Sequence, residues 1–125
     1  MPVINFAADK VMVAQDGTPM TLKSAPHPMG GNDYIEGVWN ISSLDKTAGS
    51  VNAIITAQIS NDGVHYLDSS ITSNQSSVPV SPIEINGYVR AAFLRFKYGL
   101  HVTGSSGDMD WTAFCLHVNL LQSGT

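Results

Sequence analysis

Two stretches near the C-terminal end of the chain, residues 96–102 and 114–120, have apolar side chains at every second position. Alternation with a period of two is typical of a β-strand that buries one face and exposes the other. The apolar positions are Phe96, Tyr98, Leu100 and Val102 in the first stretch and Phe114, Leu116, Val118 and Leu120 in the second. The sequence therefore predicts two long strands, each with one face that must be covered.

The segment between these stretches, residues 104–108, is rich in glycine and serine, which predicts an antiparallel hairpin. A slip of one residue would turn every apolar side chain toward water, so the register is well specified. The predicted pairs are Phe96 with Val118, Tyr98 with Leu116 and Leu100 with Phe114. The other face of the hairpin carries Arg95, Lys97, His101 and Thr103 from one strand and Trp111, Cys115, His117 and Asn119 from the other. An isolated hairpin is marginally stable in water, so the rest of the chain is expected to supply a second sheet.

Other segments with β-like patterns precede the hairpin. Residues 34–42 alternate, and residues 51–60 have apolar side chains at the odd positions throughout. Asn-Asp-Gly at 61–63 favours a hairpin turn, with residues 64–67 as the returning strand, while residues 69–77 are a solvated loop or a weak edge strand. No segment of useful length has a helical period. The predicted fold class is all-β, an antiparallel β-sandwich and most simply a jelly roll.

The first 32 residues are expected to lie outside this sandwich as a docking arm. Their β-like runs are short, and residues 24–32 contain prolines and glycines that disfavour a regular ladder. A segment with few opportunities for burial recovers its ordering entropy by contacting something else. The predicted organisation is an N-terminal arm at 1–32 and one sandwich domain at 33–125. Deletion of residues 2–24 is then expected to leave the sandwich folded.

The charge balance argues against nucleic acid as a partner. Six basic and ten acidic residues give a net charge of −4, and no cluster of Lys or Arg interrupts this average. Charged residues make up 13% of the chain, against a usual share of about 25%. We therefore expect a polar, largely uncharged surface that does not bind nucleic acid.

The sequence has neither a run of about eighteen apolar residues nor the N-terminal pattern of a secretory signal. We therefore expect no membrane insertion, no export, and assembly in the cytoplasm. The single cysteine, Cys115, cannot form an internal disulfide and is interpreted as a small core or interface residue.

Several residues invite a metal-site hypothesis. His101, His117 and Cys115 share the predicted polar face, as a zinc site would need. In the predicted register the two imidazoles are roughly 13 Å apart along the ladder, at about 3.3 Å per residue, which is too far for one ion. Asp108 and Asp110, with Asp62 and Asn61 elsewhere, could offer oxygen ligands to calcium, but Asp and Asn are also common turn residues. Because the sequence also lacks a nucleophile elbow, a phosphate loop and paired carboxylates, we expect no metal, no cofactor and no enzymatic activity.

The predicted contact surface is the outward face of the hairpin. This face is too apolar and too weakly charged to be fully exposed, and closed symmetry is the usual way of burying such a patch. Trp111 and Tyr66 could instead form a platform for stacking a sugar. Aromatic residues are enriched at subunit boundaries, which favours the subunit contact over the sugar platform. His27 is held between two prolines and is added to the contact residues as a rigidly presented side chain. The candidate contact residues are Trp111, Cys115, His117, Arg95, Lys97 and His27.

Two motifs carry a family resemblance. Residues 57–66, Ala-Gln-Ile-Ser-Asn-Asp-Gly-Val-His-Tyr, resemble a hairpin of discoidin-like, galactose-binding-type β-sandwiches. Residues 86–90, Asn-Gly-Tyr-Val-Arg, resemble the strand that follows it there. Together with a Gly/Ser turn and a final Trp-Thr-Ala strand, the pattern is similar to small structural proteins of tailed phages, notably capsid decoration or cement proteins. The chain departs from secreted discoidin-type lectins because it has no signal peptide and no disulfide cysteines.

This resemblance covers about residues 50–121 and implies a function. It implies a non-enzymatic bacteriophage virion protein that decorates the capsid, with the major capsid protein as partner. It also implies a homo-oligomer, with a trimer as the expected number. The alternative is a carbohydrate-binding module or a tail-associated adhesin that uses exposed aromatic residues.

Overall fold

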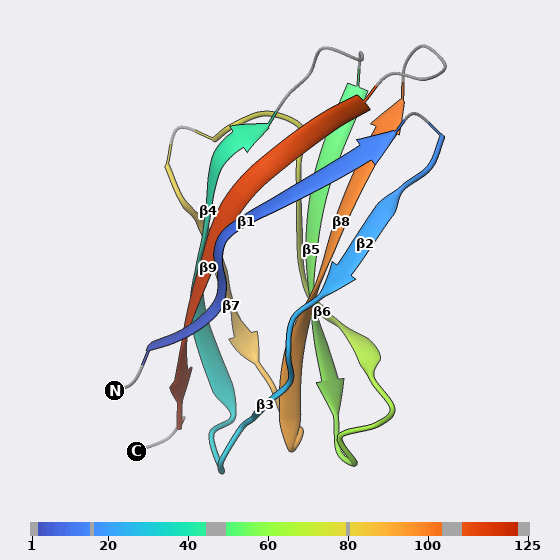
Figure 1. Cartoon of the computed structure of the whole chain (residues 1–125). Helices are drawn as coiled ribbons and strands as arrows, with labels where there is room; N and C mark the ends of the chain where they lie inside the picture. The colour runs from blue at the N-terminus through green and yellow to red at the C-terminus, as the bar shows by residue number, and fades with distance from the viewer. Residues whose placement is uncertain (1–2, 16, 45–49, 80, 104–108, 123–125) are drawn as a thin grey trace.

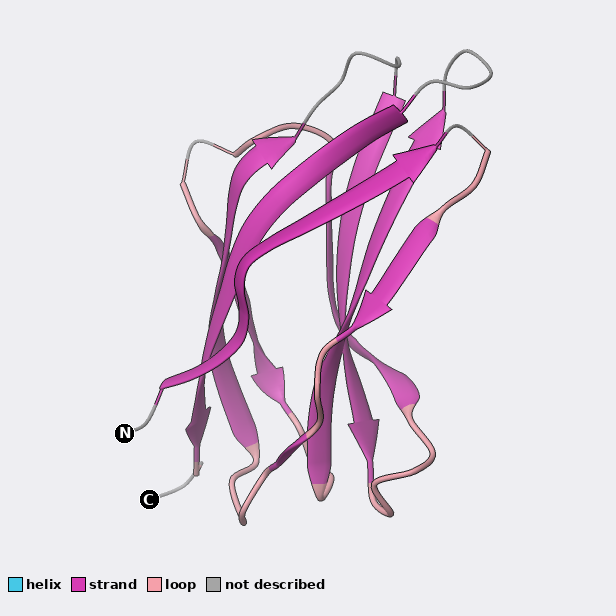
Figure 2. Cartoon of the chain, in the orientation of Figure 1, coloured by secondary structure: helices cyan, strands magenta, loops and turns pink. Residues whose placement is uncertain are grey.

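The structure, a computed structural model, describes residues 3–15, 17–44, 50–79, 81–103 and 109–122. Strands and the loops that join them make up this part of the chain (Figure 2). The strands form two sheets that pack face to face as two layers (Figure 1). No helix in the described residues is long and apolar enough to cross a membrane.

The two sheets draw their strands from all parts of the sequence. Sheet A has the order β1-β9-β4-β7, and sheet B has the order β2-β8-β5-β6, with the short β3 also paired to β8. In sheet A the strands are β1 (Val3–Gln15), β9 (Met109–Leu121), β4 (Tyr34–Leu44) and β7 (Ile83–Tyr88). In sheet B they are β2 (Met20–Lys23), β8 (Phe93–Thr103), β5 (Ser50–Ser60), β6 (Leu67–Gln75) and β3 (His27–Pro28).

The strand order is that of a jelly roll. The outermost strands of the chain pair with each other, β1 with β9 and β2 with β8, and the inner strands follow as β4 with β7 and β5 with β6, all antiparallel. The chain is thus a long ribbon folded at the β5–β6 turn and wound on itself. Winding adds two more antiparallel ladders, β9 with β4 and β8 with β5. This confirms the predicted all-β antiparallel sandwich and its jelly-roll form.

The two alternating stretches form the centre of the core. All eight apolar positions predicted to face inward in 96–102 and 114–120 are buried. The rings of Tyr98 and Phe114 meet across the core with centroids 4.9 Å apart, and Trp39 packs edge-on against Phe114. Burial raises the pKa of the Tyr98 phenol, whose hydroxyl donates a hydrogen bond to the carbonyl oxygen of Phe6.

The predicted pairing of these two strands is wrong. β8 belongs to sheet B, where Tyr98 lies opposite Ile55 and Leu22, and β9 belongs to sheet A, where Leu116 lies opposite Trp39 and Ala7. The two apolar faces pack against each other across the sandwich instead of side by side in one hairpin. This arrangement gives each strand a hydrogen-bonded neighbour on both sides, which a lone hairpin cannot do. The predicted turn at 104–108 lies outside the described residues.

The N-terminal segment also differs from the expected arm. β1 pairs along β9 over most of its length, with register shifts between Asn5 and Lys10. Ala7, Met12 and Ala14 on its inner face are buried in the core. The irregular pairing breaks the alternation that a single long strand would show, which explains why the sequence read as two short runs.

The segment at 24–32 is extended and ordered, with its main contacts to β8. β3 pairs with β8, and Met29 is 1% exposed. The sandwich therefore begins at β1 and not at residue 33. The predicted turn at 61–63 is present, with Gly63 at a positive φ of 77°. Its returning strand β6 starts at Leu67, so residues 64–67 are mostly turn, and the polar segment 69–77 contains most of an edge strand.

Candidate functional site

The face of sheet A that points away from the core carries an apolar strip. Val11 and Val13 on β1 lie opposite Ala113 and Trp111 on β9, and Met109 extends the row at the same end. The exposed fractions are 57% for Val11, 40% for Val13, 58% for Met109 and 40% for Trp111. We call these four residues the apolar strip.

Two further predicted contact residues continue the row of the apolar strip along β9. Cys115 is half-buried and lies opposite Asn40, and His117 is exposed and lies opposite Val38, which is itself 42% exposed. No Asp, Glu, Lys or Arg side chain thus interrupts the outer surface of β9 from Met109 to His117. The sequence correctly grouped Trp111, Cys115 and His117 on one face but missed Val11 and Val13, because β1 had been interpreted as an arm.

The other three predicted contact residues lie elsewhere. Arg95 and Lys97 are on β8, on the outer face of sheet B, and therefore on the opposite side of the sandwich from Trp111. His27 is on β3 at the edge of sheet B, where its ring makes an edge contact with Phe6 at a centroid distance of 6.2 Å. The prediction of a single contact surface is therefore wrong, because it assumes that β8 and β9 pair in one sheet.

The outer face of sheet B has a polar network that runs across three strands. The Nε atom of Arg95 donates to Oε1 of Gln58 at 2.8 Å, and Nε2 of Gln58 donates to Oδ1 of Asp68 at 2.8 Å. The Nζ atom of Lys97 donates to both carboxylate oxygens of Asp68, at 3.1 and 2.9 Å. The hydrogen bond from Gln58, and next the ammonium of Lys97, hold the pKa of Asp68 below its ordinary value. Gln58 is 6% exposed, so the network is anchored on a buried amide.

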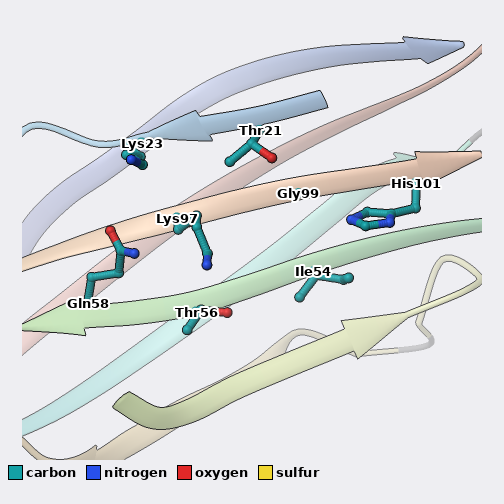
Figure 3. Close-up of a pocket in the computed structure, with 8 residues that line it drawn as sticks. All are labelled: Thr21, Lys23, Ile54, Thr56, Gln58, Lys97, Gly99 and His101. Carbon is teal, nitrogen blue, oxygen red and sulfur yellow. The ribbon is translucent and has the colours of Figure 1, made fainter. Parts of the chain in front are cut away.

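A shallow cavity of about 370 Å³ lies beside this network, over the middle of β8. Gly99 forms its floor, with Lys97 and His101 on either side of it along the strand (Figure 3). Thr21 and Lys23 border it from β2, and β5 borders it on the other side. We call this cavity the sheet B groove. No sequence pattern predicts this groove, because it depends on β2 and β5 being the two neighbours of β8.

The residues considered for metal binding are kept apart. His101 faces outward from sheet B, whereas His117 and Cys115 face outward from sheet A, so they cannot share an ion. Of the calcium candidates, Asp108 lies outside the described residues, and Asp110 is fully buried in β9. Asp62 closes the β5–β6 turn. The described residues include no group of three or more His, Cys, Asp or Glu side chains placed to hold a metal ion.

Asp62 organises the β5–β6 turn through its two carboxylate oxygens. Oδ1 accepts hydrogen bonds from the backbone amides of Val64 and His65, both at 2.8 Å, and Oδ2 contacts Nδ1 of His65 at 2.7 Å. Contact with the His65 side chain is the largest cause that lowers the pKa of Asp62. Ser60 donates to Asp62 and not to His65, so the three residues close a turn and do not form a nucleophile with its base.

The two aromatic residues of the sugar-platform hypothesis do not share a surface. Trp111 lies on sheet A, and Tyr66 lies beside Arg95 of sheet B. The guanidinium of Arg95 sits 3.8 Å from the centroid of the Tyr66 ring and covers one of its faces. A joint platform of Trp111 and Tyr66 is therefore excluded by the fold.

The sequence matches no protein-family model and no curated protein. Solved structures from infectious bursal disease virus are similar in fold. The structure of the Gx strain of infectious bursal disease virus aligns with a TM-score of 0.71 at 12% identity, covering 99% of this chain and 33% of that chain. The VP2 subviral particle of the same virus aligns with a TM-score of 0.60 at 13% identity, covering 98% of this chain and 33% of that one.

A third structure, that of T=1 particles derived from this virus, aligns with a TM-score of 0.53 at 17% identity and covers 98% of this chain and 32% of that one. This chain therefore spans about one third of the length of the viral chains it resembles. At these identities the likeness establishes a shared fold. The sandwich of this protein has the same fold as part of the VP2 chain of that subviral particle.

Proposed function

We propose that this protein is a non-enzymatic structural component of a virus particle. More narrowly, we propose that it is a decoration protein of a tailed-phage capsid, assembled in the host cytoplasm and located in the virion. Its partners are further copies of itself, as a trimer, and the shell built by the major capsid protein.

The observation that carries this proposal is the apolar strip on sheet A. Its four side chains are each at least 40% exposed, and the adjoining positions on β9 and β4 are uncharged. Apolar surface of this kind, continuous along two paired strands, is stabilised when a partner covers it. A flat sheet face with an aromatic residue and few charges has the composition of a subunit contact.

Two further observations support the proposal. The jelly roll spans almost the whole described chain, and the same architecture builds viral shells. The Ser60, Asp62 and His65 cluster in the β5–β6 turn uses its polar atoms to close the turn. This use of polar groups favours a structural role over a catalytic one.

Cosedimentation with empty shells tests the proposal. The full chain is mixed with shells assembled from the major capsid protein encoded by the same genome, and the shell-bound fraction is measured. The strip variant carries Val13→Thr and Trp111→Ser. The control variant carries Val64→Thr, a change of the same kind at a valine that is 73% exposed in the β5–β6 turn.

We expect the wild type and the Val64→Thr control to bind shells equally. The strip variant should bind at least about tenfold more weakly, since burying one large apolar side chain contributes about 1.5–3 kcal/mol. Equal binding by the strip variant would remove sheet A as the contact. Absence of binding by the wild type to any form of the shell would overturn the decoration role.

A further inference from the structure

The sheet B groove concentrates positive charge on an acidic protein. Three of the six basic residues of the chain, Lys23, Arg95 and Lys97, lie on the outer face of sheet B, although the net charge of the whole chain is −4. Lys23 and Lys97 are directly opposite each other across the β2–β8 ladder. The residues that line the groove include no carboxylate. Asp68, just outside this lining, pairs with Lys97, so the positive charge left for a ligand in the groove is that of Lys23.

The three cations on the outer face of sheet B, of which Lys23 and Lys97 line the groove, differ in how far they are already paired. Arg95 is bonded to Gln58 and covered by Tyr66, and Lys97 is bonded to Asp68. Lys23, by contrast, has no hydrogen-bond partner among the described residues. Its ammonium is weakly attracted to the Asp68 carboxylate. One lysine that lines the groove thus has its three ammonium donors available.

Further polar groups next to the floor are also unused. Within the described part of the chain, the side chains of Thr21 and His101 have no hydrogen-bond partner. Thr21 lies opposite Gly99 on β2, and the His101 ring lies near the floor, where a Cβ placed on Gly99 would be 3.6 Å from its Nε2 atom. Available donors and acceptors therefore border the floor from two strands.

The floor itself is flat and apolar. Gly99 has no side chain, and Ile54 lies opposite it on β5. A glycine inside a strand weakens the strand and often marks a place where another molecule approaches the backbone closely. Neither a positive φ nor a tight contact requires glycine here, because a Cβ at this position would meet its neighbours at ordinary contact distances. The missing side chain leaves an open floor between Lys97 and His101.

From this arrangement we propose that the sheet B groove binds an acidic sugar. The carboxylate of the sugar contacts Lys23 beside Lys97, its hydroxyl groups pair with Thr21 and His101, and an apolar ring face lies on the Gly99–Ile54 floor. A volume of about 370 Å³ is within the usual range of about 300–1,000 Å³ for small-ligand sites. This site is on the opposite sheet from the apolar strip and does not depend on the proposed shell contact.

The test is a titration of the full ¹⁵N-labelled chain, followed by the amide chemical shifts of its NMR spectrum. The probe is D-glucuronate, with D-glucose as the neutral control and inorganic phosphate as the control for an oxyanion without a sugar. We expect saturable shifts at Gly99, Lys97 and Thr21 with glucuronate in the millimolar range, and much smaller ones with glucose or phosphate at the same concentration.

Three variants locate the site. Gly99→Val should abolish the shifts by filling the floor, while the melting temperature stays the same or rises because valine favours strands. Lys23→Gln should weaken binding roughly three- to tenfold, as expected for losing one partly exposed charged contact. Arg90→Gln removes one positive charge outside the groove and should leave the affinity unchanged.

Each contrary result has a definite meaning. Glucose binding as well as glucuronate would overturn the role of the carboxylate, and phosphate binding as well as glucuronate would overturn the role of the sugar. Equal loss with Arg90→Gln would mean that general charge, and not the groove, attracts the ligand. No saturable shift at Gly99 with any probe would overturn the site, even if Gly99→Val fails to fold, because the wild type and Lys23→Gln are measured independently.

Discussion

Gly37 and Gly99 both sit inside long strands, but their surroundings are very different. Gly37, on the inner face of β4, is buried, and a Cβ there would lie 2.9 Å from the backbone oxygen of Ile85 and 3.3 Å from Cγ2 of Val118. Gly99 faces outward, and its nearest neighbours would be at 3.6 Å or more. Gly37 is needed for the close approach of β7, whereas Gly99 is not needed for the fold.

This contrast gives a prediction about stability. Gly37→Ala should lower the free energy of unfolding by about 1–3 kcal/mol, because the added methyl group overpacks the core against backbone that cannot move aside easily. Gly99→Ala should change it by less than about 1 kcal/mol and in the stabilising direction, because glycine is entropically costly in a strand. Urea denaturation of both variants measures the two effects. Equal effects would contradict the assigned facing of these glycines.

Asp68 predicts a dependence of stability on pH. Its pKa in the folded protein is below the ordinary value because of hydrogen bonds from Gln58 and Lys97. A depressed pKa in the folded state stabilises the fold above the ordinary value of about 4 and loses this effect as the pH falls through the folded-state value. Because the side chain of Asp68 is 53% exposed, solvent screening limits the contribution to about 0.2–1 kcal/mol.

The comparison of wild type with Asp68→Asn isolates this contribution. The wild type should be the more stable protein near neutral pH, and the difference in the free energy of unfolding should shrink toward zero in acid. Asp62 titrates in both proteins, so its effect cancels in the difference. Urea midpoints at several pH values provide the measurement, and a difference that grows as the pH falls would rule out the assigned role of Asp68.

Individual residues differ in how far the sequence reveals their environment. The alternation in residues 51–60 predicts that odd positions such as Ile55 and Ala57 are buried, and they are. It does not predict that the even positions Thr56 and Gln58 are also buried on the outer face. Their burial comes from Asp68, Arg95 and other side chains brought in by neighbouring strands. Local periodicity contains no information about these neighbours.

At the scale of elements, the strands follow from the sequence more readily than their partners do. Alternation of apolar and polar residues indicates which face of a strand is buried, but it does not indicate the partner. Two strands can bury their apolar faces side by side in one sheet or against each other across two sheets. The consecutive strands β8 and β9 lie in different sheets and pack across the core. The consecutive strands β5 and β6 pair in one sheet, around a turn with Asp62 and Gly63. The Asp-Gly signal was specific enough to predict its hairpin. For the segment 104–108, the only evidence for a hairpin was its richness in glycine and serine.

The two faces of β1 predict different responses to substitution. Met12 points into the core and is 2% exposed, whereas the adjacent Val11 is 57% exposed. Met12→Ala should lower the free energy of unfolding by about 2–5 kcal/mol through lost burial and a cavity. Val11→Thr, which keeps a β-branched side chain, should change it by less than about 0.5 kcal/mol. Thermal or urea unfolding of the two variants measures these effects. If both substitutions have small effects, β1 is a loosely held arm and not a core strand.

Deletion of residues 2–24 now has an expected outcome opposite to that of an arm. The deletion removes β1 and β2, an edge strand from each sheet, together with the buried residues Ala7, Met12 and Ala14. The hydrogen-bonding edges of β9 and β8 would then be exposed, and such edges promote aggregation. We expect loss of a cooperative thermal transition, measured by circular dichroism. A truncated protein that retains a sharp transition would show that the remaining strands fold without β1.

At the scale of the whole molecule, the two outer faces differ in chemistry. Sheet A presents the apolar strip, and sheet B presents the basic groove with its polar network. Since the two sheets face opposite ways, a partner that covers sheet A leaves the groove of sheet B open to solvent. The proposed shell contact and the proposed sugar site are therefore compatible on one copy. The sequence could not supply this division, because it had placed Trp111 and Lys97 on the same face.

The apolar strip also predicts self-association in the absence of a shell. Val11, Val13, Met109 and Trp111 form one continuous surface, and a closed oligomer, with a trimer as the proposed number, would bury it on every copy. Sedimentation velocity of the full chain at micromolar concentration should show an oligomer. Val13→Thr with Trp111→Ser should shift the oligomer toward monomer, because about 1.5–3 kcal/mol per apolar side chain is lost at each contact.

The double variant Arg95→Gln with Lys97→Gln, on sheet B, is the control and should leave the oligomer intact. A wild type that is monomeric at high micromolar concentration would remove the oligomer, and a control that dissociates as readily as the strip variant would move the contact to sheet B.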